Sequence, residues 1–383
     1  MPVWHEFTRD WRENGDLQVV GIVQEQHPDR ARLFAQWRQL DFPILWDPFN
    51  LTGSKVVPNV VAVDEAGVVR IVNPKQESFE WDFLATDFTD AEVVEAAAQT
   101  AAEPARAKRA QAEAELLRRF LARDGKRLDV PLRELGELSE TAPEDAALAF
   151  RLGVASRMRY DSANPCPTDF QDALDRWGAA LDLDPNQYIW RRRIQQYGPR
   201  MDKPYDFYGW VERATGEVRQ RGEEPIVLPT TLTPAELAQP ARGASSPEAV
   251  TEPDPGGRVL RDDGLMRVEA AVAPDSSGKR PLASVHLTLR PDAKRKAHWT
   301  NGLTPAQVWL DTPEGWSVDR ALRELAEPDS EVSNEARVVT FEVRAPEGTR
   351  SGKLTGYALF HVCEDVNGAC TYLRRDFEVV AHL

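Results

Sequence analysis

The chain has few cysteines, no long apolar run and no net positive charge. Three cysteines among 383 residues exclude a small secreted protein held together by disulfides. No segment approaches the ~18 consecutive apolar residues of a membrane span. The net charge of −15, from 62 acidic and 47 basic side chains, argues against non-specific binding to nucleic acid or to anionic lipid.

The N-terminal stretch is acidic and aromatic and has no apolar signal-peptide core. This favours a cytoplasmic protein, with the periplasm as the alternative if the true start lies upstream of Met1. No Ser/His/Asp nucleophile motif, phosphate-binding glycine loop or zinc motif occurs, so no cofactor or metal is expected. The basic run Lys294–Lys296 is short enough for a solvated turn, and Cys166 lies in a proline-flanked loop.

Residues 1–100 alternate between helical and strand patterns. The apolar, β-branched run Leu17–Val23 is typical of a buried strand. Apolar residues recur at helical spacing from Asp29 to Leu40, after a His-Pro helix start. Val60–Val63 and Val68–Val72 flank an Asp/Gly turn, which predicts a β-hairpin.

Residues 101–240 are predominantly helical in pattern. Ala146–Tyr160 and Phe170–Leu183 each carry apolar residues at helical spacing, and an Asp-Pro pair follows the second. Two such helices resemble a tetratricopeptide hairpin. Because a single hairpin cannot bury its own apolar face, this region is interpreted as a connector packed on other parts of the chain.

The segment Trp190–Pro199 alternates aromatic residues with arginine and glutamine. Arg191–Arg193 could hold a carboxylate or phosphate. The alternative, which we favour, is an aromatic-rich docking segment whose arginines stack on neighbouring rings or pair with the acidic surface.

Residues 241–257 are rich in proline, glycine, serine and acidic side chains, which predicts a linker. Residues 258–383 then show short apolar or alternating runs between Pro/Gly turns. Several short strands at this spacing indicate an antiparallel β-sandwich. The predicted strands are Arg267–Val272, Ser284–Leu289, Ala306–Leu310, Arg337–Val343 and Leu354–Val362.

Cys363 and Cys370 bracket a turn signal, Asn367-Gly368, between two predicted strands, so they can face each other across a hairpin. A bridge closing this loop would stabilise the fold by roughly 2.5 kcal/mol on the chain-entropy model. Three interpretations remain open: a redox-active pair, a structural bridge or two reduced thiols, and a metal site that also uses His361.

The N-terminal sequence carries a more specific likeness. Met1–Phe7, followed by Gly15–Val23 and then by the Val57-Pro58 pair before an apolar strand, resembles ResA-like, TlpA-type thioredoxins. The resemblance implies a thioredoxin-like fold in which Pro58 is a cis-proline that faces the catalytic cysteines and, with Val57, guides the substrate. It also implies that the first strand and the cysteine pair would lie upstream of Met1.

With its thioredoxin-like region, the segment Trp190–Pro199 and a strand-rich tail, the whole chain is similar to ResA-like proteins described by a Trp-Ala-x-x-Sec-Gly-x-x-Cys motif. This resemblance implies that a selenocysteine codon upstream of Met1 was read as a stop. A domain that kept this fold and lost the chemistry is the alternative. The C-terminal cysteines, together with Val308–Trp316, resemble the N-terminal domain of DsbD-type disulfide reductases. That resemblance implies an immunoglobulin-like sandwich whose cysteine pair relays electrons.

We therefore expect a multidomain protein with four parts. They are an incomplete α/β thioredoxin-like domain (1–100), a tetratricopeptide-like helical connector (101–240), a linker (241–257) and an all-β sandwich (258–383). The expected function is thiol–disulfide or selenol-assisted redox chemistry on a protein or peroxide substrate. The expected partner is a protein thiol or disulfide or a thioredoxin-type electron donor. The N-terminal site of such an enzyme would be inactive in this chain. The competing hypothesis is a non-catalytic interaction protein with the helices and the sandwich as docking surfaces.

Overall fold

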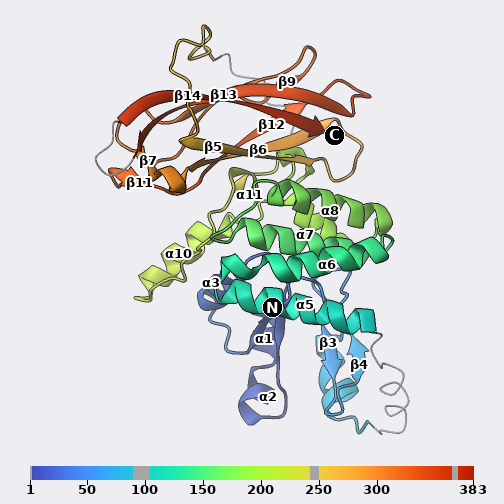
Figure 1. Ribbon diagram of the computed structural model, residues 1–383. Coiled ribbons are helices and arrows are strands. Elements are labelled where there is room, and N and C mark those ends of the chain that lie inside the picture. Colours follow the sequence, from blue (N-terminus) through green and yellow to red (C-terminus); the bar gives the residue numbers. More distant parts are fainter. Residues whose placement is uncertain (1, 89–103, 242–249, 365–369) are drawn as a thin grey trace. The chain divides into compact units, whose positions relative to one another are not determined.

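The computed structural model describes residues 2–88, 104–241, 250–364 and 370–383. It contains both helices and sheets, with a helical region and the two sheets of a β-sandwich (Figure 1). Its contacts define two compact units. The first comprises Met1–Asn164, Ala179–Trp190 and Trp210–Thr230, and the second comprises Pro165–Gly178, Arg191–Gly209 and Thr231–Leu383. The predicted connector, residues 101–240, is thus shared between the units.

The first unit begins with two short helices. Helix α1 spans Pro2–Phe7 and α2 spans Arg9–Asn14. The hydroxyl of Thr8 donates to the carbonyl of Trp4 at 2.6 Å. A threonine that bonds back to the carbonyl four residues earlier bends a helix, which accounts for the break.

Two small sheets follow in this unit. Strands β1 (Gly21–Val23) and β2 (Ile44–Trp46) pair in parallel and are joined by helix α3 (Pro28–Arg38). Strands β3 (Val61–Val63) and β4 (Val69–Val72) form the predicted antiparallel hairpin. Within the described residues β1 is not paired with β3. The predicted strand over 17–23 is shortened to its last three residues, and it is not buried as predicted, because Ile22 is 46% exposed.

The turn of this hairpin has the predicted chemistry. Gly67 has φ +82°, which a residue without a Cβ adopts readily. The Asp64 carboxylate accepts hydrogen bonds from the backbone of Ala66 and Val68 and pairs with Arg70 at 2.5 Å. A 3₁₀ turn (Gln76–Ser78) and a π-helical turn (Glu80–Leu84) follow the hairpin.

An aromatic cluster connects the first helices to the β3–β4 hairpin. The rings of Trp4 and Phe7 meet the Phe79 ring edge-on at 5.4 and 6.1 Å. The cluster also buries Ala62 of β3 and contacts Ile71 of β4. Edge-to-face aromatic pairs of this kind contribute about 0.5–1.5 kcal/mol each beyond their buried area.

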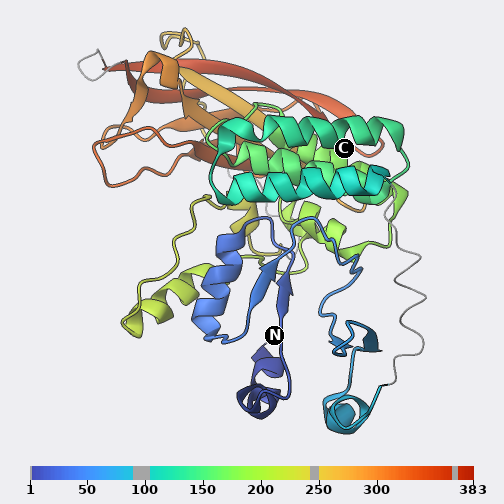
Figure 2. The same cartoon turned by 60° about the horizontal axis from the view of Figure 1, so that its bottom comes forward.

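The rest of the first unit is helical. Helices α5 (Pro104–Leu121) and α6 (Asp129–Thr141) lie side by side (Figure 2), and α6 contacts α7 (Ala146–Tyr160). The Asp145 side chain caps α7 by accepting from the Leu148 amide at 2.9 Å. Helix α10 (Trp210–Gln220) packs on α3, where the Trp37 and Trp210 rings stack at 5.9 Å. Residues 89–103, where the predicted thioredoxin-like domain (1–100) meets the predicted helical connector (101–240), fall outside the described residues.

Two helices cross the boundary between the units. Helix α8 (Asp169–Leu183) matches the predicted helix within one residue, and α9 spans Tyr188–Gln195. A 3₁₀ turn (Arg200–Asp202) and helix α11 (Pro234–Leu237), which has a complete Thr233/Glu236 capping box, belong to the second unit.

The second unit contains the two sheets of the sandwich. One sheet has the order β10-β8-β13-β7-β11, with β14 paired on β13, and the other has the order β5-β6-β12-β9. The strands are β5 (Met266–Pro274), β6 (Leu282–Pro291), β7 (Ala297–Thr300), β8 (Gln307–Asp311), β9 (Ser317–Val318), β10 (Leu322–Glu324), β11 (Val332–Ser333), β12 (Arg337–Arg344), β13 (Ser351–Glu364) and β14 (Cys370–His382).

All five predicted strands of this region are confirmed, each with shifted or extended ends. Their inward side chains form one core, in which Val285, Phe341 and Phe360 are fully buried. The predicted turn at Lys294–Lys296 is a 3₁₀ turn, Ala293–Arg295, that ends with Lys296 in the left-handed region. Strand β7, directly after this turn, was not predicted.

No helix in the described ranges is both long enough and apolar enough to cross a membrane.

Candidate functional site

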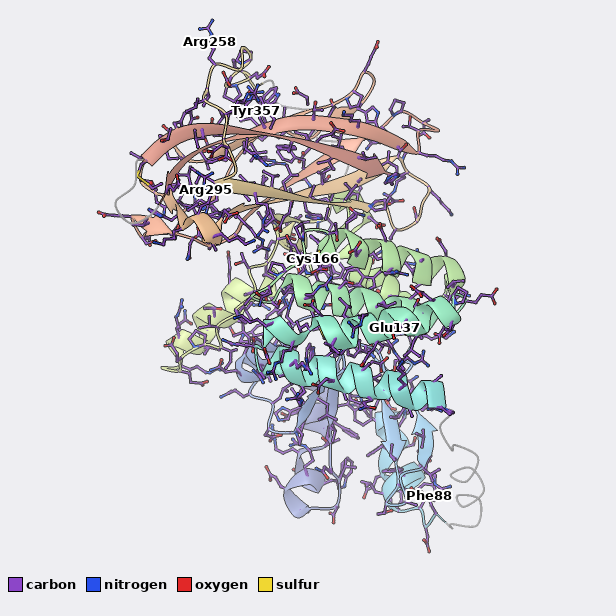
Figure 3. The ribbon with its side chains drawn as sticks, viewed as in Figure 1. Phe88, Glu137, Cys166, Arg258, Arg295 and Tyr357 are labelled. Atoms are coloured by element: carbon purple, nitrogen blue, oxygen red, sulfur yellow. A yellow bond between two sulfur atoms is a disulfide. The ribbon has the colours of Figure 1, made fainter. Side chains whose placement is uncertain are left out.

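Cys363 and Cys370 form a disulfide at the end of the β13–β14 hairpin. They are directly opposite each other in the strand register, with their Cα atoms 4.0 Å apart. Figure 3 draws the bond in yellow. The predicted facing of the two cysteines is thus confirmed, whereas the predicted Asn367-Gly368 turn lies outside the described residues. An antiparallel register places directly opposed side chains on one face of the sheet, so the bond forms between neighbours.

The two cysteines differ in their exposure to solvent. Cys363 is 3% exposed, whereas Cys370 is an exposed residue. Thiol–disulfide exchange requires a thiolate to approach one sulfur and expel the other. Of the two cysteines, Cys370 is therefore the one that solvent can approach.

Strand β7 supplies the side chains beside Cys363. His298 is its direct cross-strand partner, and the hydroxyl of Thr300 lies 2.6 Å from its sulfur. The same hydroxyl lies 3.6 Å from the sulfur of Cys370. Alternation along a strand puts residues 298 and 300 on one face, so β7 presents both side chains to the disulfide.

His361 and Tyr372 form the next cross-strand pair on the same face of the hairpin, and their rings are 4.6 Å apart. Burial lowers the pKa of His361, although the charge of Glu327 opposes this shift. Burial likewise raises the pKa of Tyr372. Both side chains are therefore neutral near pH 7, and neither brings a formal charge to the disulfide.

The carboxylate that follows Cys363 in the chain is neutralised by an arginine. Arg295 (labelled in Figure 3) donates to Glu364 at 2.9 Å and to Asp263 at 2.7 Å. These hydrogen bonds raise the pKa of Arg295. With Glu364 paired, a thiolate forming on Cys363 meets less repulsion from its neighbour.

The metal interpretation of His361, Cys363 and Cys370 gains no support. Within the described residues no group of three or more His, Cys, Asp or Glu side chains could hold a metal ion. Both thiols are engaged in the disulfide instead, and a metal requires them as thiolates.

Val57 and Pro58 lie in the first unit, in the segment between β2 and β3. The peptide bond between them is cis, the isomer that the resemblance implied. Val57 is 51% exposed and its neighbour Val56 is 53% exposed. The sequence of the first unit contains no cysteine, so Pro58 and the Cys363–Cys370 pair belong to different units.

Cys166, the remaining cysteine, is a free thiol in a loop of the second unit. Its amide donates to the Asp169 carboxylate at 2.8 Å, and its sulfur lies 3.7 Å from the Thr168 hydroxyl. These contacts describe a turn before helix α8, in agreement with the prediction of an incidental loop cysteine.

The arginines of the Trp190–Pro199 segment are engaged within the chain. Arg192 stacks over the rings of Tyr205 and Phe207, at 4.4 and 5.0 Å, and Arg193 stacks over Trp177 at 5.8 Å. Arg191 donates to the Ser276 carbonyl at 2.9 Å. The favoured prediction of ring stacking is thus confirmed for two of the three arginines.

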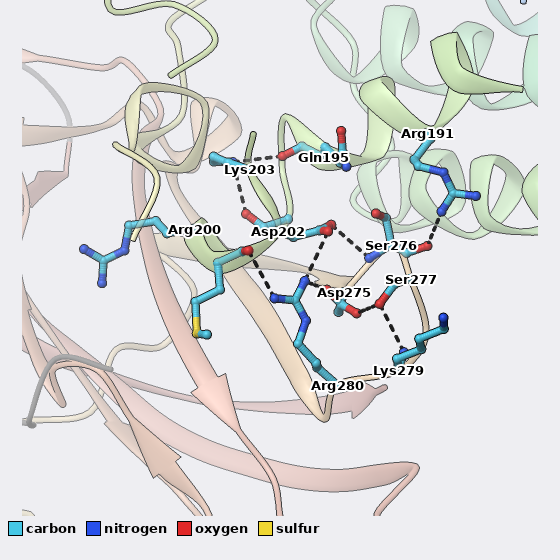
Figure 4. Close-up of polar contacts among 12 residues, drawn as sticks. Arg191, Gln195, Arg200, Asp202, Lys203, Asp275, Ser276, Ser277, Lys279 and Arg280 are labelled. Atoms are coloured by element: carbon cyan, nitrogen blue, oxygen red, sulfur yellow. Dashed lines mark hydrogen bonds and ion pairs between the residues drawn. The ribbon is translucent and has the colours of Figure 1, made fainter. Parts of the chain in front are cut away.

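A polar network fixes the loop after β5 to the 3₁₀ turn Arg200–Asp202 (Figure 4). Asp202 accepts from the Ser276 amide at 3.0 Å and from Arg280 at 3.3 Å. Arg280 also pairs with Asp275. Burial alone would raise the pKa of Asp275, but the hydrogen bonds from Arg280 and Ser277 and the charge of Arg280 together lower it. The network therefore holds the loop after β5 against the 3₁₀ turn.

Lys203 is a buried cation in the same region, only 4% exposed. Its ammonium donates to the carbonyls of Gln195, Gln196 and Gly198 at 2.8–3.1 Å, which matches its three N–H donors. These carbonyls end helix α9, where a cation is favoured by the helix dipole. Burial lowers the pKa of Lys203 to about 8, against the opposing charge of Glu236.

We expect the free energy of unfolding to depend on pH through this lysine. Between pH 8 and 10.5 the unfolded chain still binds a proton that the native Lys203 has lost, so stability rises with pH in that window. The slope is up to about 1.4 kcal/mol per pH unit. The variant Lys203→Met should lack this rise. Urea unfolding of both proteins from pH 7 to 10.5 measures it, and parallel curves would contradict the assignment.

Sequence reasoning missed Thr300 and His298, the two side chains of β7 beside the disulfide. They lie 63 and 65 positions before Cys363, and only sheet pairing brings them together. The short alternation Ala297–Thr300, with buried Ala297 and Trp299, was the signal that could have indicated the strand.

Comparison with known proteins adds little to this geometry. No family model matches the chain, and no curated protein matches it. Among solved structures, the GAE domain of yeast GGA1 is similar, with a TM-score of 0.20 and 9% identity. That alignment covers 32% of this chain and 98% of the yeast chain. A likeness at this level assigns neither family nor function.

Proposed function

We propose that this protein is a thiol–disulfide oxidoreductase that exchanges electrons through Cys363 and Cys370. The observation that carries the proposal is the asymmetric disulfide, in which Cys370 is an exposed residue and Cys363 is a buried one. A structural bridge has no need of an exposed sulfur, whereas exchange requires one sulfur that a partner can attack.

The chemistry follows in two steps. A thiolate of a protein dithiol attacks the Cys370 sulfur, forms a mixed disulfide and releases Cys363 as a thiolate. The second thiolate of the partner then attacks the partner's sulfur in the mixed disulfide. This step forms the partner's disulfide and releases Cys370 as a thiolate. The partner becomes a disulfide, the Cys363–Cys370 pair becomes a dithiol, and two electrons are transferred.

The proposal extends to the folds of the parts. Parallel strands β1 and β2 joined by α3, followed by Val57-Pro58 and the β3–β4 hairpin, support a thioredoxin-like arrangement in the first unit. Helices α7 and α8 support a tetratricopeptide-like pair, and the two antiparallel sheets support a DsbD-like, immunoglobulin-like sandwich. The partner class is then a thioredoxin-type dithiol protein.

The reduction potential of the pair tests the proposal. The full chain is equilibrated in dithiothreitol redox buffers, and its free thiols are trapped and counted by mass spectrometry. We expect a potential between about −200 and −270 mV, the range of exchanging dithiols. A value well below about −300 mV would identify a structural bond and leave the interaction role as the better proposal. Cys166→Ser should keep the wild-type potential.

The same disulfide should stabilise the fold modestly. Its loop of about eight residues corresponds to about 2.5 kcal/mol on the chain-entropy model. The double variant Cys363→Ser/Cys370→Ser should lose this amount in urea unfolding, and reduced wild-type protein should behave like the variant. Equal stability of oxidised and reduced protein would show that the bridge contributes nothing to the fold.

A further inference from the structure

We infer that Thr300 is the hydrogen-bond donor that receives the leaving thiolate of Cys363 during exchange. The inference rests on the proposed function and names a residue that sets its rate. It comes from the position of one hydroxyl, which lies 2.6 Å from the Cys363 sulfur and 3.6 Å from the Cys370 sulfur. Disulfide sulfurs carry no proton, so the threonine hydroxyl donates.

The sheet holds this hydroxyl in place from two sides. Thr300 pairs with Val332 of β11, and the preceding residue, Trp299, pairs with Val362 of β13. The branched side chain of threonine also restricts χ1. The donor is therefore positioned before the reaction starts and needs little reorganisation when charge appears on the sulfur.

The buried sulfur needs such a donor. When an incoming thiolate bonds to the Cys370 sulfur, the electron pair of the S–S bond passes to the Cys363 sulfur, which becomes an anion. Cys363 is 3% exposed, so water supplies little of the hydration that a thiolate has in solution. Burial alone raises the pKa of a thiol and makes it a poorer leaving group, whereas a hydrogen bond to the thiolate lowers that pKa.

The charged and titratable groups described around the Cys363 sulfur do not replace the Thr300 hydroxyl as its hydrogen-bond donor. His298 faces Cys363 across the strands, and its Nδ1 lies 3.2 Å from the Lys296 carbonyl. His361 has a pKa lowered mainly by burial. Glu364 is paired with Arg295 at 2.9 Å. None of these contacts directs a donor onto the Cys363 sulfur.

Two substitutions separate the hydroxyl from the shape of the side chain. Thr300→Val keeps the branched shape and removes the donor, whereas Thr300→Ser keeps the donor and removes the methyl group. Thr371→Val is a matched control, because Thr371 is adjacent to Cys370 but pairs with Val362 on the opposite face of β14. All three changes are made in the full chain.

The first measurement is the second-order rate of disulfide reduction by dithiothreitol. We expect Thr300→Val to slow reduction about three- to tenfold, with Thr300→Ser and Thr371→Val within twofold of wild type. The second is the pH profile of Cys363 alkylation in a Cys370→Ser background. Removing the donor should raise the pKa of Cys363 by about one unit, the size expected for a hydrogen bond to a charged group.

Wild-type rate and pKa in folded Thr300→Val would overturn the inference, as would equal losses in the valine and serine variants. If the valine variant does not fold, Thr300→Ala replaces it with the same expected result. A wild-type disulfide whose potential lies well below about −300 mV would instead refute the proposed function. The two failures are therefore distinguishable.

Discussion

Replacing Gly356 by valine is expected to destabilise the β-sandwich by about 3 kcal/mol or more. Gly356 is buried in β13, between Leu310 of β8 and Phe377 of β14. A Cβ atom at this position would come within 2.2 Å of the Trp309 carbonyl oxygen and within 2.7 Å of the Phe377 ring. The carbonyl belongs to the backbone of a paired strand, so it cannot move aside as a flexible side chain could.

Gly356→Ala tests the same contact with the smallest possible side chain. On backbone entropy alone, glycine to alanine within a strand stabilises by roughly 0.5–1 kcal/mol, so a loss of stability would show that the steric contact dominates. Gly136→Ala in α6 is the matched control, because a Cβ there meets nothing within 4 Å. We expect it to stabilise the protein. Urea unfolding measures the change in stability of each variant, and hydrogen exchange of β8, β13 and β14 shows where the sheet is weakened. Wild-type stability of Gly356→Val would contradict the close packing around Gly356.

The elements that were predictable from the sequence are those with strong local patterns. Ala146–Tyr160 became α7 with its predicted ends, and the hairpin around Asp64 and Gly67 has its predicted turn. Strands β12 and β13 alternate or run apolar over eight or more residues. Periodicity, caps and turn residues act within a few positions of the chain, so they can be identified from the local sequence alone.

What could not be predicted depends on pairing between distant segments. Strand β7 is four residues long and gains its partners from β13 and β11. The break between α1 and α2 depends on a hydrogen bond from the Thr8 hydroxyl to the carbonyl of Trp4. For the site, the facing of Cys363 and Cys370 was readable because only a short hairpin separates them. The contact of Thr300 with these sulfurs could not be predicted, because it depends on the pairing of β7 with β13 in the sheet.

Arg337 is a buried arginine at the start of β12 that contacts residues next to Thr300. Its side chain is 4% exposed and its guanidinium stacks over the Trp299 ring at 4.2 Å. It forms ion pairs with Glu335 at 2.8 Å and with Glu327 at 3.6 Å. Burial alone would raise the pKa of Glu335, but the hydrogen bond from Arg337 helps to lower it. The guanidinium also donates to the side chain of Asn301, the residue after Thr300.

Arg337→Ala is therefore expected to cost about 1–3 kcal/mol, because it leaves the buried Asn301 side-chain oxygen without its donor, whereas the Glu335 side chain, 42% exposed, is solvated by water. The loss should concentrate where Arg337 connects β12 with β7 and β11, so hydrogen exchange should accelerate most in residues 297–301 and 332–337. Arg344→Ala, at the exposed end of the same strand, should stay within about 0.5 kcal/mol of wild type. Because Asn301 follows Thr300 directly, Arg337→Ala should also loosen the hydroxyl beside Cys363 and slow disulfide reduction in the direction of Thr300→Val. Unchanged exchange in residues 297–301 would show that β7 is held independently of Arg337.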